Sequence, residues 1–493
     1  MQQGSSPMTS NPCWRTIGAA FALALLAAAP AHAAPAQVNA GDTAWLLIAT
    51  ALVLLMTIPG LALFYGGLVR TKNMLSILAQ VFAIVCVVSL MWVMFGYSFT
   101  YTGGAAASFF GGSSKLFLWG VTVDSTVPTF TNGIEIPEFA FIAFQMTFAC
   151  IAPALMVGAF AERMRFTALI VFIILWVTLV YMPIAHMAWY WTGPDELAEA
   201  AKAVLQAPTG PARRTAEAAL AAARENAGLF HQWGTLDFAG GLAVHVSAGI
   251  AGLVGSILLG QRAGYGRVSM APHNLALTMI GGALLWVGWF GFNAGSSLRA
   301  NGTAALAMLN TFIAAAAAAI SWMAAEWTTR GKPSLLGMVS GALAGLVAVT
   351  PAAGYASPMG AIGLGFVAGA ACLWFSTSFK NRFQYDDSLD VFGVHCVAGV
   401  LGTIAVAFLV SPKLGGSGVI DYIARPGQGV VAAFDLGPQV WAQVKAVLVT
   451  LVWSGFMTAQ IFKVVDFSIG LRPAEAEEQI GLDISDHGER SYN

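Results

Sequence analysis

The sequence predicts an all-α integral membrane protein with eleven transmembrane helices, built as an inverted five-helix repeat (helices 1–5 and 6–10) around a central pore. Of its 493 residues, 57% are hydrophobic and only 10% are charged, and the mean hydropathy is +0.72, whereas soluble domains carry about 25% charge. Eleven apolar runs are long enough to cross a hydrocarbon core about 30 Å thick. The pattern Val-His-x-x-Ala-Gly occurs twice inside these runs, at 244–249 and 394–399. Matching motifs in two halves of a membrane protein are typical of transporters with inverted repeats.

The N-terminus resembles a targeting segment more than a membrane span. Arg15 precedes an apolar run at 17–29, and Ala31-His32-Ala33 is a small-x-small cleavage site. The run is too short for a stable span, so residues 1–33 are predicted to be a secretory signal peptide whose cleavage leaves the mature N-terminus outside the cytoplasm. An extra N-terminal helix is the alternative.

The eleven spans follow, with boundaries set by the apolar runs. They are predicted at 43–67, 75–99, 138–160, 166–190, 238–260, 273–294, 303–327, 335–352, 358–379, 391–411 and 439–465. Paired positive charges fall in alternate loops, at Arg70 and Lys72, Arg163 and Arg165, Arg262 and Arg267, Arg330 and Lys332, and Lys380 and Arg382. Positive charge marks cytoplasmic loops, so we predict a periplasmic N-terminus and a cytoplasmic C-terminus in the cell inner membrane.

One polar segment, from Asp195 to Gln232, interrupts the apolar pattern on the external side. Its alanine-rich stretches at 197–205 and 214–226 are separated by Pro208-Thr209-Gly210-Pro211, which predicts two short helices in a hairpin. We interpret the segment as a solvated surface insertion without chemistry of its own.

The two histidine hexapeptides lie on spans five and ten, which are five spans apart and therefore cross the membrane in opposite directions. This predicts two halves of opposite polarity. The predicted organisation is a signal peptide at 1–33, a first repeat at 42–260 with the external insertion at about 192–233, a second repeat at 261–411, an external loop and eleventh helix at 412–470, and a cytoplasmic tail at 471–493.

His245 and His395 are the strongest candidate functional residues, because an ionisable side chain in a span is costly and marks a substrate or proton path by default. Asp237, Gly241 and His245 are spaced i, i+4, i+8, which predicts one helix face with His245 about 12 Å below the outer mouth. His395 follows Asp390 by five residues from the inner side. Two neutral imidazoles at similar depth can share one proton, which suits ammonia or ammonium. A pair of satisfied core histidines is the alternative.

Other functional classes find little support in the sequence. The formal net charge of −1 gives no basis for nucleic-acid binding. The five cysteines form no C-x-x-C, and no third ligand is predicted beside the histidine pair. We therefore predict no metal, no cofactor and no enzymatic activity, and a membrane metalloenzyme fails for lack of ligands.

Five stretches, in order, resemble the ammonium transporter (Amt/Mep/Rh) family, and the tail and the Asp-Phe-Ala-Gly-Gly form favour its bacterial Amt branch. They are Pro-Gly-Leu-Ala-Leu-Phe-Tyr-Gly-Gly at 59–67, Asp-Phe-Ala-Gly-Gly at 237–241, Trp-Phe-Gly-Phe-Asn-Ala-Gly-Ser at 289–296, Asp-Val-Phe-Gly-Val-His at 390–395, and Gly-Leu-Asp at 481–483 with His-Gly-Glu at 487–489. The resemblance covers nearly everything after about Asp42. The external insertion after Trp189 departs from the family pattern and borders the entrance.

The resemblance implies an outer vestibule lined by Phe144, Trp189 and Ser296, where an aromatic face can hold a cation for about 0.5–2 kcal/mol. Asp237 would support this site without touching the substrate, although a role at the helix start would alone explain a carboxylate there. For Trp189, an interfacial aromatic anchor is the alternative.

The resemblance also implies that Phe148 and Phe292 stack as a gate that excludes water and hydrated ions, with ordinary core packing as the alternative. The predicted function is ammonium/ammonia transport across the inner membrane through a narrow hydrophobic pore, with deprotonation near the gate and passage past His245 and His395. The family further implies a homotrimer surrounded by membrane lipid, and an acidic tail that helps dock a PII-type signal protein. The alternative function is an ammonium sensor that signals through such a partner.

Overall fold

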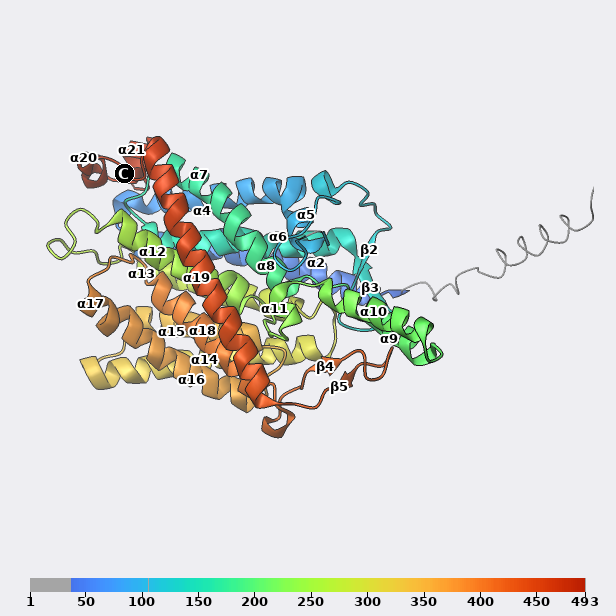
Figure 1. Cartoon of the computed structure of the whole chain (residues 1–493). Coiled ribbons are helices and arrows are strands. Elements are labelled where there is room, and N and C mark those ends of the chain that lie inside the picture. Colours follow the sequence, from blue (N-terminus) through green and yellow to red (C-terminus); the bar gives the residue numbers. More distant parts are fainter. Residues whose placement is uncertain (1–36, 105, 493) are drawn as a thin grey trace, which may run out of the picture. The chain divides into compact units, whose positions relative to one another are not determined.

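The computed structural model describes residues 37–104 and 106–492. Within these residues, eleven helices are long and apolar enough to cross a membrane, which confirms the predicted fold class (Figure 1). The predicted signal peptide at 1–33 lies outside the described residues. Most of α6 and α15 is buried among the other helices, while α19 runs obliquely across the outside and packs on α7, α12 and α18.

The spanning helices of the two halves follow each other along the chain. In the first half they are α2 (Ala40–Leu55) with α3 (Ala62–Leu68), α4 (Met74–Met91) with α5 (Tyr97–Tyr101), α6 (Glu138–Phe160), α7 (Phe166–Trp176) with α8 (Met182–Trp189), and α12 (Ser247–Leu259). In the second half they are α13 (Leu275–Gly295), α14 (Gly302–Arg330), α15 (Leu335–Val349), α16 (Pro358–Trp374) with α17 (Lys380–Phe383), and α18 (Val397–Leu409), and α19 (Leu436–Ile469) comes last.

Several spans contain a π turn, in which the backbone hydrogen bonds reach one residue further than in an α-helix. These wide turns occupy Trp92–Gly96, Val177–Tyr181, Gly241–Val246, Phe375–Phe379 and Phe392–Cys396, whereas Met56–Leu61 is a kink at which Ile58 leaves helical geometry. The predicted span boundaries agree with the helices to within a few residues, with one informative difference. The fifth span was predicted to start at 238, but its helix starts at Gly241.

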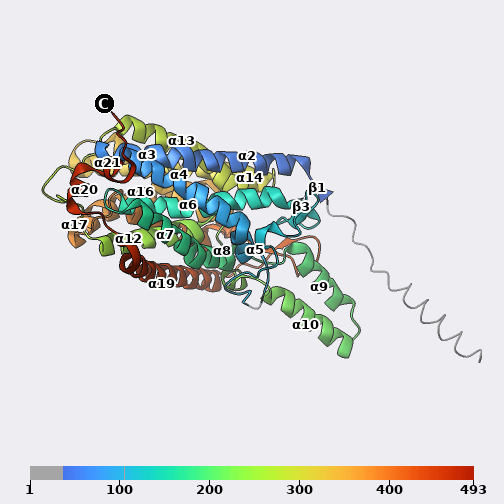
Figure 2. The same cartoon turned by 90° about the horizontal axis from the view of Figure 1, so that it is seen from above.

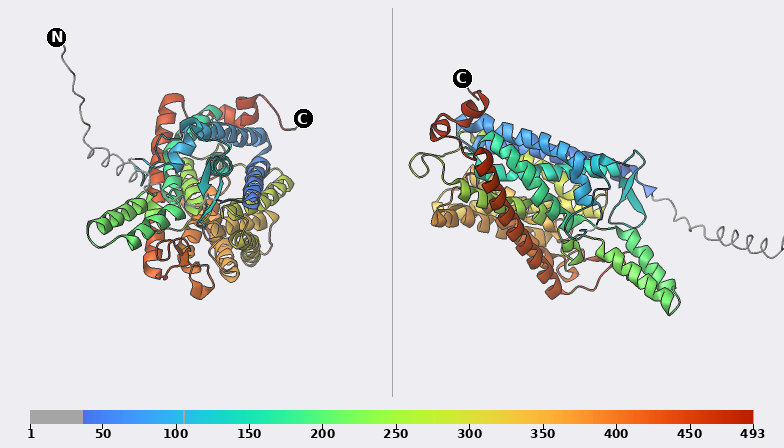
Figure 3. Two further views of the ribbon diagram at one scale, coloured as in Figure 1. Left: turned by 90° about the vertical axis from the view of Figure 1, so that its right-hand side faces the viewer. Right: turned by 45° about the horizontal axis from the view of Figure 1, so that its top comes forward.

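The insertion that was predicted to be external forms the predicted hairpin, α9 (Pro194–Gln206) and α10 (Pro211–Glu225), which projects from the bundle (Figure 2). A short helix that was not predicted, α11 (Leu229–Gln232), returns the chain to the bundle. The base of the hairpin is fastened by Asp195, whose carboxylate accepts a hydrogen bond from the backbone N–H of Gly133, 2.9 Å away. We call this end of the bundle the hairpin end; Figure 3 (left) views it directly.

Short strands accompany the hairpin end. They are β1 (Gln37–Val38), β2 (Thr126–Pro128), β3 (Ile134–Pro137), β4 (Ile420–Asp421) and β5 (Val430–Val431). β2 pairs antiparallel with β3, placing Val127 opposite Ile136, and β4 pairs antiparallel with β5. These ribbons order loops around the helix ends.

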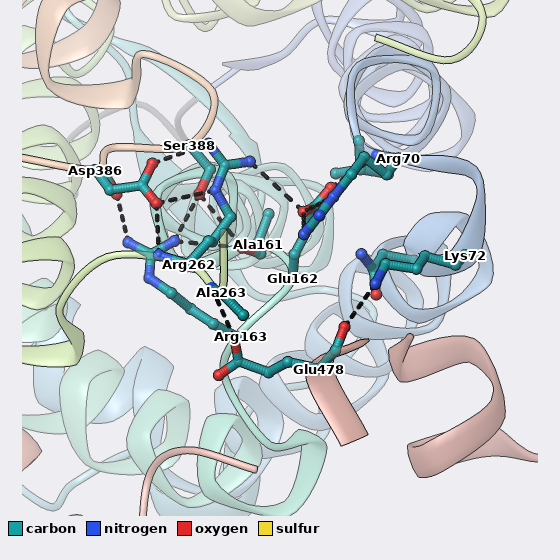
Figure 4. Close-up of polar contacts among 12 residues, drawn as sticks. Arg70, Lys72, Ala161, Glu162, Arg163, Arg262, Ala263, Asp386, Ser388 and Glu478 are labelled. Atoms are coloured by element: carbon teal, nitrogen blue, oxygen red, sulfur yellow. Dashed lines mark hydrogen bonds and ion pairs between the residues drawn. The ribbon is translucent and has the colours of Figure 1, made fainter. Parts of the chain in front are cut away.

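Basic residues from several of the predicted cytoplasmic loops meet at the opposite end, which we call the arginine end (Figure 4). Arg70 pairs with the buried carboxylate of Glu162, and Arg262 pairs with Asp386 at 2.9 Å. The fully buried Arg163 donates to the backbone carbonyl of Asp386 and to the neighbouring Ser388 hydroxyl. Loops far apart in sequence therefore share one side of the bundle, as the alternation of positive charge requires.

The C-terminal tail packs against the arginine end instead of extending as a solvated segment. Its two short helices are α20 (Glu475–Ile480) and α21 (Leu482–His487). The carboxylate of Asp483 accepts from the backbone N–H of Ser76 at 2.7 Å, and that of Asp486 accepts from Phe166 at 3.0 Å. The tail thus satisfies free N–H groups at the starts of α4 and α7, where a negative charge is favoured.

Candidate functional site

His245 and His395 lie side by side in the centre of the bundle. Their Nδ1 atoms are 3.3 Å apart, and the two rings are nearly parallel, at 8°. Both side chains are buried, with exposed fractions of 0% and 6%. Because two imidazole nitrogens at this distance can share a single proton, one ring donates and the other accepts. The sequence prediction that the two imidazoles meet agrees with this geometry.

The environment of His245 differs from that of a histidine that serves packing alone. His186, in α8, has both ring nitrogens on backbone carbonyl oxygens, those of Thr100 at 2.8 Å and Ala107 at 2.6 Å. The Nε2 atom of His245 is buried and has no hydrogen-bond partner among the described residues. Since buried polar atoms are almost always paired, this nitrogen is available to a small polar guest.

Both histidines occupy π turns at the starts of the helices that carry them, Gly241–Val246 before α12 and Phe392–Cys396 before α18. Such turns are frequent at functional sites. The glycine that ends each hexapeptide explains how the turns approach. A Cβ on Gly249 would overlap the backbone nitrogen of Cys396, and one on Gly399 would lie 3.2 Å from the Cβ of His245. Each repeat therefore uses its glycine to admit the histidine turn of the other.

Aromatic rings continue from the histidine pair in one direction. Trp289 stacks on His245 with centroids 5.4 Å apart at 11°, and its Nε1 donates to the Thr350 hydroxyl. Phe292 lies 5.9 Å from His245 and stacks on Phe148 at 4.2 Å. The stack joins α6 to α13, and Phe148 and Phe292 are almost fully buried. Sequence reasoning missed Trp289, although its spacing of three residues from Phe292 places both on one helix face.

The predicted vestibule residues gather beyond this stack. Phe144 lies 5.0 Å and Trp189 5.8 Å from Phe148, between ring centroids. The hydroxyl of Ser296 donates to the carbonyl of Phe292 at 2.8 Å, which leaves its oxygen lone pairs free to accept. The Trp189 indole donates to the backbone carbonyl of Asp237 at 2.9 Å. Phe148 therefore joins the rings of Phe144 and Trp189, and the Ser296 hydroxyl lies one helical turn from Phe292, the ring that stacks on Phe148.

Asp237 caps the fifth span. Its carboxylate accepts hydrogen bonds from four successive backbone N–H groups, at 2.9 Å from Gly240, 2.5 Å from Gly241, 2.9 Å from Leu242 and 3.3 Å from Ala243. Burial raises the pKa of this carboxyl, and the four N–H groups oppose that effect. The prediction that Asp237, Gly241 and His245 share one helix face was wrong, because the cap holds residues 237–240 outside the helix, with Gly240 at φ 106°.

The counterpart of Asp237 in the turn that carries His395 is Asp387, which sequence reasoning missed. Asp390, which was used to place His395, instead pairs with Lys380 at 2.7 Å. The Oδ2 atom of Asp387 accepts from the backbone N–H of Phe392 at 2.8 Å, in the turn that carries His395. Asp387 precedes His395 by eight residues, as Asp237 precedes His245. This repeated spacing was the signal that could have found it.

Within the described part of the chain, no group of three His, Cys, Asp or Glu side chains lies together in a way that could hold a metal ion. The site is therefore a set of aromatic rings, one hydroxyl and an imidazole pair. Such a set can hold a small cation at the aromatic end and exchange protons at the imidazole end.

Comparisons with known proteins point in one direction. The sequence model of the Ammonium Transporter Family matches residues 44–492. The ammonium transporter of Bacillus subtilis is 42% identical, over 92% of this chain and 98% of its own length, and that of Aquifex aeolicus is 40% identical, over 94% and 96%. Among solved structures, a sensor Amt protein superposes with a TM-score of 0.74 at 25% identity, covering 91% of this chain and 98% of its own. Mep2 of Saccharomyces cerevisiae superposes at 0.72 and 28% identity, covering 89% and 91%.

Proposed function

The chain belongs to the ammonium transporter family, and on this premise we propose that ammonium crosses the membrane along the aromatic rings and the histidine pair. The observation that carries the proposal is the His245–His395 contact of 3.3 Å, beside a buried Nε2 without a partner. Neutral imidazoles at this depth offer hydrogen bonds to ammonia and exclude ions that cannot give up a proton.

Recruitment takes place at Phe144, Trp189 and Ser296. The ring faces attract the cation through their quadrupole, and the serine oxygen accepts one N–H of ammonium. Asp237 supports the site from behind, since its carbonyl holds the Trp189 indole while its carboxylate is occupied by the helix start.

Phe148 and Phe292 form the gate. Their stacked rings leave no polar atom to replace a hydration shell, so ammonium sheds water and loses a proton near them, yielding ammonia and a proton. Ammonia and the proton then pass the histidine pair, together or separately. Potassium matches ammonium in size but can neither donate hydrogen bonds nor lose a proton, so it is rejected at this step.

We further propose that the hairpin end is periplasmic and the arginine end cytoplasmic, in the cell inner membrane, after removal of a signal peptide at 1–33. The transporter assembles as a homotrimer with one pore in each subunit. Solvated acidic residues of the docked tail, such as Glu475 and Glu477, help a PII-type signal protein to bind at the arginine end.

A second candidate function is ammonium sensing through such a partner. One structural neighbour is described as a sensor Amt protein, and the tail of this chain is fastened to the starts of α4 and α7. A sensor would bind ammonium and alter partner binding without net transport. Measuring transport directly separates the two candidates.

The test is a current measurement on purified protein in liposomes adsorbed to a solid support. We expect an ammonium pulse to produce a current and a potassium pulse to produce none. In His245→Ala and His395→Ala we expect the ammonium current to fall by about tenfold or more, or potassium to begin to conduct, because a buried polar partner is removed. Absence of both current and ammonia permeability in the unmodified protein would refute transport; unchanged currents and selectivity in both variants would refute the role of the pair.

A further inference from the structure

Asp387 carries a carboxylate oxygen that its capping role does not use. The side chain is buried, at 1% exposure, and its Oδ2 accepts from the backbone N–H of Phe392 at 2.8 Å. Its Oδ1 has no hydrogen-bond partner among the described residues. A buried carboxylate oxygen without a hydrogen-bond partner is costly. The cost is offset if this oxygen binds a proton or hydrogen-bonds to a water molecule.

Asp237, which stands eight residues before His245 as Asp387 stands before His395, uses both of its carboxylate oxygens as a cap. Both carboxylate oxygens of Asp237 accept backbone N–H groups, two at each oxygen. The repeat therefore places a carboxylate eight residues before each histidine, but only the one near His395 keeps an oxygen free. This asymmetry is not required to start a helix, since one oxygen suffices for a cap.

Polar groups lie between Asp387 and the surface of the arginine end. Lys380 donates from Nζ to the backbone carbonyl of Asp387 at 2.5 Å and to the Asp390 carboxylate at 2.7 Å. The Asp390 side chain is 40% exposed, so this group reaches the surface of the arginine end. The buried Ser376 hydroxyl, which also lacks a partner among the described residues, lies against Gly393, two residues before His395 in the same turn.

Burial raises the pKa of Asp387 to about 6, an effect that Lys380 and the backbone N–H groups of Phe392 and Val391 oppose and Asp390 reinforces. A carboxyl with such a pKa takes up and releases protons readily near neutral pH. The unpartnered oxygen of Asp387 and the charges around it therefore both indicate that this carboxyl can change its protonation state.

We propose that Asp387 is the proton-accepting group at the inner end of the pore. This rests on the proposed function, in which a proton from ammonium reaches the histidine pair. An N–H bond at the pair breaks as an O–H bond forms at Oδ1, by way of intervening water. The O–H bond then breaks, the proton passes to cytosolic water, and the carboxylate is restored. No electron is transferred and no further reactant is needed.

The substitution Asp387→Asn separates this role from capping, because the amide oxygen can still accept the Phe392 N–H but the side chain can no longer take up a proton. In proteoliposomes we expect the ammonium-evoked current to fall by about tenfold or more, while ammonia permeability, followed with an internal pH dye, stays at the unmodified value. Asp435→Asn is the matched control. Asp435 also caps a helix, accepting from Gly437 at the start of α19, and its variant should keep the full current.

The outcomes are distinct. An undiminished current in Asp387→Asn overturns the inference. Loss of current and ammonia permeability together shows that Asp387 only holds the helix start, and also overturns it. If the unmodified protein gives neither current nor permeability, the proposed function fails instead.

Discussion

At the scale of single residues, the same side chain does different work depending on which of its polar atoms the fold leaves free. His186 has both ring nitrogens on carbonyl oxygens, whereas His245 shares one nitrogen with His395 and keeps the other free. Asp237 and Asp387 differ in the same way. Residue type and spacing identify such candidates, and a buried polar atom without a partner beside the histidine pair marks the ones to test.

Trp189 is the residue whose loss should weaken recruitment most cleanly. We expect Trp189→Ala to raise the KM for ammonium by about 2- to 30-fold, since a cation over an aromatic face gains about 0.5–2 kcal/mol. Concentration-dependent currents give this value. Trp119, which is 82% exposed, provides the control, because Trp119→Ala should leave KM unchanged. An unaltered KM in Trp189→Ala would show that this tryptophan is only an anchor.

His231, in α11 at the hairpin end, makes part of the stability depend on pH. It stacks on Trp191 with centroids 5.0 Å apart, and burial lowers its pKa from 6.5 to about 4. Between about pH 4 and pH 6.5, His231 binds a proton in the unfolded chain but stays neutral in the folded one. The contribution of His231 to stability is therefore complete above pH 6.5 and is lost as pH falls, at up to about 1.4 kcal/mol per pH unit.

The measurement is the unfolding temperature in detergent between pH 7.5 and 5. We expect it to fall more steeply in the unmodified protein than in His231→Gln, which cannot titrate. Identical slopes in the two proteins would contradict the assignment.

At the scale of elements, the site depends on how two π turns approach each other. Hydropathy located the helices that carry them, but a π turn is a local widening that apolar periodicity does not reveal. Gly249 and Gly399, the last residues of the two hexapeptides, allow this approach. A side chain at either position would push the opposite histidine turn away.

Gly249→Ala tests this packing. We expect the added Cβ to lower the free energy of unfolding by about 1–3 kcal/mol, as overpacking of a well-packed core does, and to reduce the ammonium current by displacing His395. Thermal unfolding in detergent and the current assay report the two effects. Gly363 in α16 has open space where a Cβ would lie, so Gly363→Ala should be neutral or stabilise by up to about 1 kcal/mol. Equal behaviour of the two variants would rule out close approach at Gly249.

At the scale of the whole molecule, the tail and the loops of the arginine end form one connected set of contacts. Glu478 is 2% exposed; it pairs with Arg472 and accepts from the backbone N–H of Ala263 at 3.2 Å. Arg262, which precedes Ala263, forms an ion pair with Asp386, and Asp386 is the residue before Asp387. The last helices of the chain are thus linked to the segment that leads into the His395 turn (Figure 4).

We expect Glu478→Ala to release the tail, because Arg472 and the Ala263 N–H lose their buried acceptor at a cost of about 1–3 kcal/mol. Thermolysin cleavage before Leu482, which is fully buried in the docked tail, should then become about tenfold faster or more, since cleavage follows the population of the open form. Glu475 is solvent-exposed on the same short helix, so Glu475→Ala should be cleaved at the unmodified rate. Equal rates for both variants would show that Glu478 does not hold the tail.

The sequence alone was sufficient for the eleven spans, the alternation of basic loops, the helical hairpin and the family, because hydropathy, charge and motifs are read locally along the chain. It also located the aromatic and histidine positions of the candidate site. The tertiary structure decided which atoms meet: the Nδ1 contact of His245 and His395, the stacking of Trp289 on His245, the hydrogen bond from Trp189 to the carbonyl of Asp237, and the capping of the His395 turn by Asp387 instead of Asp390. These contacts join turns and helices that lie far apart in sequence or depend on non-helical backbone, so only the packed bundle sets their distances.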